Sequence, residues 1–165
     1  MSQTRVKRKA PRSFAQAMQS EQAETLRNVL LSIAGDSVMI PPSVSRADET
    51  LIEMVIEAGY LHHGPSKLTM MQDQHCHQNA SLLFYRQEVL AIGTGYGLYD
   101  RIWWNHSWGI GRAGEIIETT ELRQKYFGVV LFGSSAKSLA ELNCVINGKH
   151  VTPGIRYLPD EHYSL

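Results

Sequence analysis

The sequence lacks the features that define several classes of protein. Its 165 residues include only two cysteines, Cys76 and Cys144. Two thiols are too few for a disulfide framework and fit a reducing compartment, with a single bridge between them as the alternative. No apolar run is long enough to cross a bilayer, and the basic N-terminus has no apolar segment of the kind that a secretory signal needs. We therefore expect a cytoplasmic protein that does not bind membranes, or one delivered into another cell by a signal that we do not recognise.

A net charge is also missing, because 16 Lys and Arg residues balance 16 Asp and Glu residues. This balance predicts no general affinity for nucleic acid. Five basic residues precede the first acidic residue, Glu21, and all five lie within residues 1–12, a stretch with almost nothing to bury. We interpret residues 1–12 as a disordered, solubilising tail, with an arm that binds nucleic acid or a partner as the alternative. Residues 13–165 are long enough for a single domain with its own core.

The spacing of apolar residues predicts an α+β fold. Helical spacing indicates helices over about 13–34 and 45–58, and a third helix from about residue 74 to residue 86. Residues 60–71 are predicted to form a loop. After the third helix the period changes to two, which predicts strands at 89–99, 102–110, 115–120 and 128–132, followed by a short helix at 135–144. The N-terminal helices are thus followed by a helix packed on an antiparallel meander.

The third predicted helix carries a thiol near its start. Asp73 is a good N-cap, which would make Cys76 the third helical residue. The helix dipole and the unpaired backbone N–H groups there favour the thiolate, the form that attacks a carbonyl carbon. A cysteine at this position is, without other support, most simply a small buried residue. Cys144, late in an amphipathic helix, is predicted to belong to the core.

The connection between the second and third predicted strands fixes how these two strands pair. The strands 102–110 and 115–120 are joined through residues 111–115, which contain Gly114. A two-residue loop would set Glu118 opposite Ser107. A three-residue loop ending in Gly114 instead matches a type I turn with a G1 bulge, which needs glycine at its left-handed position. We prefer the second loop because the glycine lies where the turn requires it.

This register predicts that a histidine and a carboxylate are neighbours. Glu118 lies opposite Trp108, which makes His106 its diagonal neighbour on the same, largely apolar face. A carboxylate buried on that face needs a partner, and His106 is the natural one. The alternating Gly93, Gly95 and Gly97 of the preceding strand indicate that something packs closely against it.

His106-Ser107-Trp108, followed after a turn by Glu118-Thr119-Thr120, resembles the His-x-Trp and acid-x-Thr pattern of papain-like and transglutaminase-like cysteine hydrolases, with Cys76 upstream at a helix start. The resemblance implies that Cys76 is the nucleophile, His106 its base and Glu118 the acid that orients the histidine. It implies a thiol-dependent acyl hydrolase or transferase, such as a peptidase, amidase, deamidase or transglutaminase. The substrate would be a protein, a peptide or a small amide, and no cofactor is expected.

The sequence departs from this pattern at two places. The acid is Glu118 where Asp is the common choice, and position 70 is Met where papain-like proteases have the glutamine of the oxyanion hole. The candidates for that role here are Gln72, Gln74 and the backbone N–H of Cys76.

Two other candidates near the site have structural alternatives. Asn79 lies one turn after Cys76, where it would either hydrogen-bond near the site or bridge parts of the structure. Trp108 would either stack on a substrate or belong to the core.

Two rival functions remain open at this stage. The first is an inactive papain-like fold that only binds a partner protein. The second is a zinc site, since His75, Cys76 and His77, with His62, His63 and His106, are suitable ligand types, although neighbouring residues on a helix point in different directions. We prefer the thiol chemistry and expect no metal.

Overall fold

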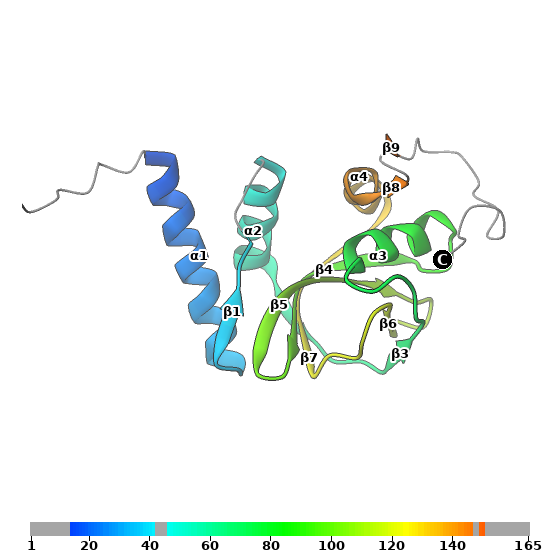
Figure 1. Cartoon of the computed structure of the whole chain (residues 1–165), viewed down its shortest axis with the longest axis horizontal. Helices are drawn as coiled ribbons and strands as arrows, with labels where there is room; N and C mark the ends of the chain where they lie inside the picture. The colour runs from blue at the N-terminus through cyan, green and yellow to red at the C-terminus, as the bar shows by residue number, and fades with distance from the viewer. Residues whose placement is uncertain (1–13, 42–45, 147–148, 151–165) are drawn as a thin grey trace, which may run out of the picture.

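The computed structural model describes residues 14–41, 46–146 and 149–150, so the predicted tail at residues 1–12 lies outside the described residues. Within these ranges the chain has the expected α+β character, with four helices and a curled, mixed sheet of seven strands (Figure 1). No helix in the described ranges has the length and hydrophobicity needed to cross a membrane.

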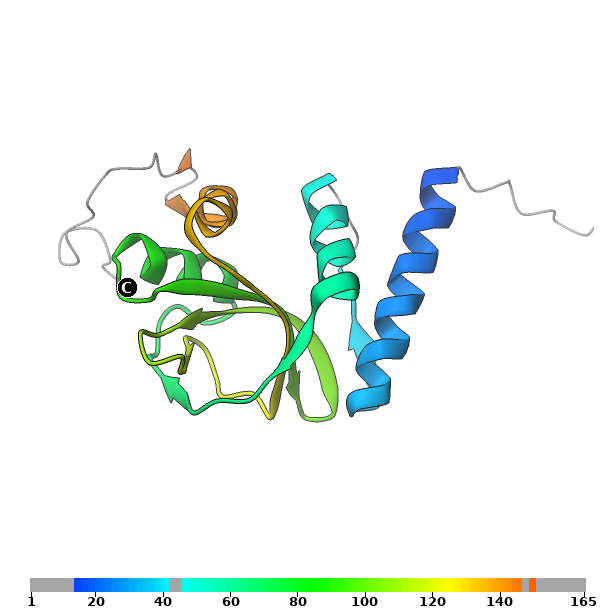
Figure 2. The ribbon, with the colours of Figure 1, turned by 180° about the vertical axis from the view of Figure 1, so that it is seen from behind.

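The helices form two pairs at opposite ends of the molecule (Figures 1 and 2). α1 (Phe14–Ile33) packs on α2 (Arg46–Ala58), and α3 (Cys76–Tyr85) packs on α4 (Gly133–Asn143). The first pair covers one end of the sheet with a core that includes Leu26 and Leu30 of α1. The second pair lies over β4 and β5, which is the packing of a thiol-bearing helix on antiparallel strands that the sequence predicts.

The sheet is built around β4. Its strands are β1 (Ser37–Met39), β2 (Tyr60–His62), β3 (Ser66–Leu68), β4 (Ala91–Tyr99), β5 (Ile102–Ile110), β6 (Ile116–Glu118) and β7 (Lys125–Leu131). They follow the order β2-β7-β4-β5-β6-β3, and β1 pairs with β5. A separate pair, β8 (Val145–Ile146) and β9 (Lys149–His150), follows α4.

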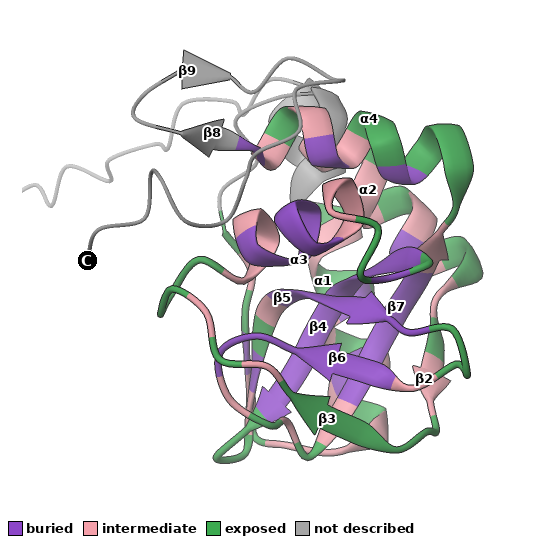
Figure 3. Cartoon of the chain, turned by 90° about the vertical axis from the view of Figure 1, so that its right-hand side faces the viewer, coloured by how far each residue is buried: buried purple, intermediate pink, exposed green. Residues whose placement is uncertain are grey.

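The predicted meander is therefore wrong in two respects. β7 does not continue beyond β6 but returns to the free edge of β4, and β1 and β3 pair in parallel with their neighbours. Eight of the nine residues of β4 are buried, and a strand that is buried on both faces needs partners on both edges (Figure 3). A period of two shows that a segment is a strand, but it does not show with which strand it pairs.

The predicted loop at residues 60–71 is also partly wrong, because it contains β2 and β3. Each of these strands has only three residues, too few for an alternating pattern to be visible in the sequence. They pair with β7 and β6 respectively, so they form the two outer strands of the curled sheet.

The predicted hairpin between β5 and β6 is confirmed. Gly109 pairs with Ile117 and Ile110 with Ile116. The Gly111 N–H donates to the carbonyl of Glu115 at 2.8 Å, as the three-residue loop requires. Gly114 has a φ of +83°, the left-handed conformation for which glycine is preferred. Glu118 is thus set on the same face of the sheet as His106.

Candidate active site

Cys76 is the first residue of α3, and the predicted cap is wrong. The N-cap residue is His75, with no side-chain cap, and the Asp73 Oδ1 instead accepts the N–H of Gln74 at 2.8 Å. Gln74 has a φ of +59°, so the chain turns between Asp73 and the helix and the Asp73 carboxylate caps this turn. Cys76 remains in the first turn of α3, where the helix dipole favours the thiolate.

His106 and Glu118 form a buried pair. The Nε2 of His106 lies 2.7 Å from the Oε2 of Glu118, and the two side chains are 1% and 0% exposed. His106 also hydrogen-bonds the thiol of Cys76. Because Nε2 is engaged by the carboxylate, the thiol faces the remaining nitrogen, Nδ1. The three predicted side chains are therefore connected in the order thiol, imidazole, carboxylate.

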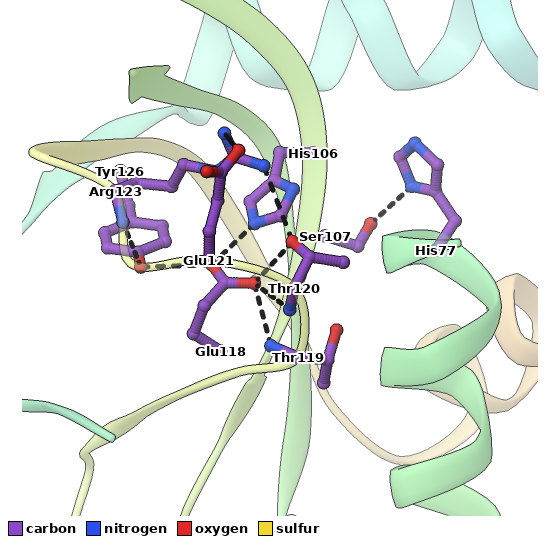
Figure 4. Close-up of polar contacts among 9 residues, drawn as sticks. All are labelled: His77, His106, Ser107, Glu118, Thr119, Thr120, Glu121, Arg123 and Tyr126. Carbon is purple, nitrogen blue, oxygen red and sulfur yellow. Dashed lines mark hydrogen bonds and ion pairs between the residues drawn. The ribbon is translucent and has the colours of Figure 1, made fainter. Parts of the chain in front are cut away.

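Glu118 is held by other donors besides His106 (Figure 4). Its Oε1 accepts the backbone N–H groups of Thr119 at 2.7 Å and Thr120 at 3.0 Å, and the hydroxyl of Thr120 at 3.1 Å. Its Oε2 also accepts the Tyr126 hydroxyl at 3.1 Å. These bonds fix the carboxylate and compensate for its loss of water, so that it can stay ionised in the core.

The glycines of β4 make room for two rings of the site. A Cβ on Gly97 would lie 3.1 Å from Cδ2 of His106, and a Cβ on Gly93 would lie 2.1 Å from Nε1 of Trp108. The expected close packing is confirmed at these two positions. His106 and Trp108 lie with stacked rings whose centroids are 6.1 Å apart, so the indole limits the movement of the imidazole.

The surroundings of Cys76 favour its charged form. Burial raises the pKa of the thiol, but hydrogen bonds from His106 and His77, with the positive charge of both rings, lower it by more. The pKa falls from 9.0 to about 5. Cys76 is thus a thiolate at neutral pH.

The two partners of the thiolate shift in the complementary directions. Burial lowers the pKa of His106, but the bonds to Cys76 and Glu118 raise it by more, so it lies above its ordinary value. Burial raises the pKa of Glu118, but the bond to His106 and the backbone N–H groups lower it by more. The three shifts favour a thiolate at Cys76, an imidazolium at His106 and a carboxylate at Glu118.

The candidate oxyanion groups lie in the turn before α3. Gln72 and Gln74 are both exposed, and the Nε2 of Gln72 is 3.5 Å from the Nε2 of His75. The backbone N–H of Cys76 is in the first turn of the helix, where no acceptor exists within the helix itself.

Asn79 and Trp108 have structural contacts in place of solvent access. The Nδ2 of Asn79 donates to the backbone carbonyl of Gln72 at 2.6 Å, and Asn79 is only 2% exposed. This bond ties the turn before Cys76 to α3. Trp108 is fully buried and packs against His106 and Tyr126. Both residues support the site from within the fold.

Two residues that contact the site are not predicted from the sequence. Tyr126, on β7, donates to Glu118, and its position could not be inferred while β7 was assigned to the wrong neighbour. The sequence indicates His77 only as a candidate metal ligand, but its Nδ1 lies 2.7 Å from the Oγ of Ser107. The three-residue loop places Ser107 on the face away from His106, but nothing in the sequence predicts that α3 packs on that face.

Among the described residues, no three or more His, Cys, Asp or Glu side chains are arranged to hold a metal ion. Comparisons of the chain with protein-family models, with curated proteins and with solved structures find no match.

Proposed function

We propose that this protein is a thiol-dependent acyl hydrolase or transferase that acts on an amide bond, as the likeness to papain-like and transglutaminase-like enzymes implies. One observation carries the proposal. The buried bond of 2.7 Å between His106 and Glu118 occupies one nitrogen of the imidazole, and the Cys76 thiol occupies the other. This arrangement orients the base and stabilises its charged form beside a nucleophile.

The first half of the reaction forms a thioester. The Cys76 thiolate attacks the carbonyl carbon of the amide, so that a carbon–sulfur bond forms and the carbonyl oxygen becomes an oxyanion. The carbon–nitrogen bond then breaks as the His106 imidazolium gives its proton to the departing amine. Cys76 is left acylated and His106 neutral, with Glu118 still ionised.

The second half regenerates the thiolate. Neutral His106 removes a proton from water or from an acceptor amine, whose oxygen or nitrogen attacks the thioester carbon. The carbon–sulfur bond breaks, the acyl group leaves as an acid or a new amide, and the thiolate and imidazolium are restored. Water gives hydrolysis or deamidation, whereas an amine gives acyl transfer. The backbone N–H of Cys76 is the candidate donor to the oxyanion, with Gln72 or Gln74 as the second.

The test is the capture of the acyl intermediate. The full chain is incubated with an activated ester such as p-nitrophenyl acetate, and intact-mass spectrometry with peptide mapping locates the acyl group. We expect one acyl group on Cys76 that neutral hydroxylamine removes, as a thioester requires, and none on the Cys76→Ala variant. The Cys144→Ala variant is the matched control and should be acylated as the wild type is.

The outcomes distinguish the rival functions. A folded protein that forms no acyl adduct on Cys76 would overturn the proposal in favour of a domain that only binds a partner. One zinc ion per purified chain, with loss of the fold on chelation, would favour the metal site instead.

A further inference from the structure

The thiol has a second imidazole beside it. His77, the residue after Cys76, hydrogen-bonds the thiol, and its positive charge also favours the thiolate. Its Nδ1 lies 2.7 Å from the Oγ of Ser107, so the side chain points from α3 toward β5 (Figure 4). His75, on the other side of Cys76 in the sequence, is exposed, and its Nδ1 lies 2.6 Å from the carbonyl oxygen of Asp73. Of the two flanking histidines, only His77 is turned into the site.

The hydroxyl of Ser107 that contacts His77 is itself hydrogen-bonded to a second residue in the core. The Ser107 hydroxyl donates to Oγ1 of Thr94 at 2.9 Å, and these two side chains are 1% and 0% exposed. Ser107 and Thr94 are paired residues of β5 and β4, so their positions are fixed by the sheet. Because a hydroxyl has one proton and Ser107 gives it to Thr94, the Ser107 oxygen accepts from His77. This chain of bonds sets the orientation of the His77 ring.

We propose that His77 is a second imidazole of the thiol site, a positioning residue that holds the Cys76 sulfur and stabilises it as the thiolate. Ser107 and Thr94 orient its ring from the sheet. The inference rests on the proposed function only in taking Cys76 as the reacting group. His106 and His77 act differently on the thiol. The hydrogen bonds of His106 lead to a carboxylate, whereas those of His77 lead to neutral hydroxyl groups. The first set stabilises a positive charge on its ring more strongly, and the second mainly fixes the direction of its ring.

The test measures the thiolate directly and needs no substrate. Alkylation of the full chain by iodoacetamide is followed across pH, and mass spectrometry of the peptide that contains Cys76 gives its rate. We expect a midpoint at about pH 5 for the wild type. His77→Ala should raise it by about one pH unit or more, since a hydrogen bond to a charged group is removed. His75→Ala is the matched control and should leave the midpoint unchanged.

Ser107→Ala tests the orientation of the ring. Alone it should raise the midpoint by less than His77→Ala does, and in the His77→Ala background it should add nothing, because Ser107 acts through the missing ring. A full and additive effect of Ser107→Ala would overturn the role given to Ser107.

A midpoint that His77→Ala leaves unchanged in a folded protein would overturn the proposal. If the alanine variant does not fold, His77→Phe retains the ring volume without its hydrogen bonds, and the same two outcomes apply to it. The alkylation midpoint can still be measured if the acylation experiment gives no adduct, because it needs no substrate. An unchanged midpoint in His77→Ala would in turn not argue against the proposed triad of Cys76, His106 and Glu118.

Discussion

The two cysteines of the chain lie at opposite ends of helices and differ in their chemistry. Cys76 is the first residue of α3, whereas Cys144 directly follows the last residue of α4. The pKa of Cys76 falls to about 5, and that of Cys144 rises to about 11. One chain thus holds a thiolate and an inert thiol of the same residue type at neutral pH.

The difference shows that burial does not decide the state of a thiol. Burial raises the pKa of both cysteines. Cys76 adjoins two imidazoles and the positive end of a helix dipole, all of which stabilise an anion. Cys144 lies at the negative end of a helix and packs against Leu82 with no such partner for its charge, and the Arg86 charge lowers its pKa by less than burial raises it. The neighbours at the sulfur, and not its depth, separate the two.

The largest expected effect comes from removing a charge that helps to keep Cys76 as a thiolate, so that its thiol becomes more like that of Cys144. Glu118→Gln retains size and polarity but removes the charge that stabilises the His106 imidazolium. The new amide would also donate to Nε2 of His106, which places the ring's own proton on the side of the thiol. We expect acyl-transfer activity to fall by about 10²- to 10⁴-fold and the pKa of Cys76 to rise, as steady-state kinetics and alkylation across pH would measure.

Thr119→Val is the matched control for this change. The Thr119 side chain lies on the opposite face, and its buried hydroxyl has no hydrogen-bond partner. Valine has nearly the same shape, so activity should stay close to that of the wild type. Loss of activity in Thr119→Val, together with retention in Glu118→Gln, would show that the carboxylate assignment is wrong.

A direct competition between the two thiols gives the next largest effect. At neutral pH the thiolate fractions implied by the two pKa values differ by about 10⁴-fold, although a thiolate of low pKa is intrinsically a weaker nucleophile. Cys144 is also 0% exposed. We expect iodoacetamide to modify Cys76 at least about 10²-fold faster, as peptide mapping of a time course would measure. Equal rates would remove the distinction on which the proposed catalytic role of Cys76 depends.

The hairpin shows how much of this site can be predicted from sequence. Gly114 fixes the turn, the turn fixes the register, and the register places Glu118 beside His106, all from residues close in the sequence. The same local reasoning places Cys76 in the first turn of a helix, although it assigns the wrong cap. Interactions between segments with few intervening residues are readable because turn chemistry constrains them strongly.

The partners of β7 and the contacts of His77 depend on tertiary packing. β7 pairs with β4 because β4 is buried on both faces, and this pairing brings Tyr126 to Glu118. Neither the apolar period of β7 nor its length identifies that neighbour. His77 reaches Ser107 only because α3 crosses β5 at this point. Such contacts join segments far apart in the sequence, for which no local signal exists.

A smaller effect should follow from moving His106 relative to Cys76. In Gly97→Ala the new Cβ would lie 2.9 Å from Cγ of Arg123 and 3.1 Å from Cδ2 of His106, so the imidazole must shift by a few tenths of an ångström. We expect activity to fall about tenfold, since catalysis depends steeply on the position of the base. The alkylation midpoint of Cys76 should rise, and the slow reaction of Cys144 should not change.

Gly64→Ala is the matched control for Gly97→Ala. Its Cβ would meet only the carbonyl oxygen of Gly114, at 3.5 Å, which is an ordinary contact. The activity of this variant should be that of the wild type. If the two glycine variants are equally active, the close approach of β4 to His106 has no part in placing the imidazole.

The smallest expected effect comes from removing the inert thiol, Cys144, whereas the first prediction changes the surroundings of Cys76. Cys144→Ala deletes one buried atom that packs against Leu82, with Met71 and Tyr85 at its edge. The loss of contact should lower the free energy of unfolding by about 1 kcal/mol, or the melting temperature by about 2–4 °C. The activity and the alkylation profile of Cys76 should not change, because no hydrogen bond links the two thiols and neither partner of the thiolate is displaced. Thermal unfolding and alkylation of the same preparation check both expectations. A shift in the Cys76 midpoint would show that the two thiols are coupled through α3, and that the contrast between them does not arise at each sulfur separately.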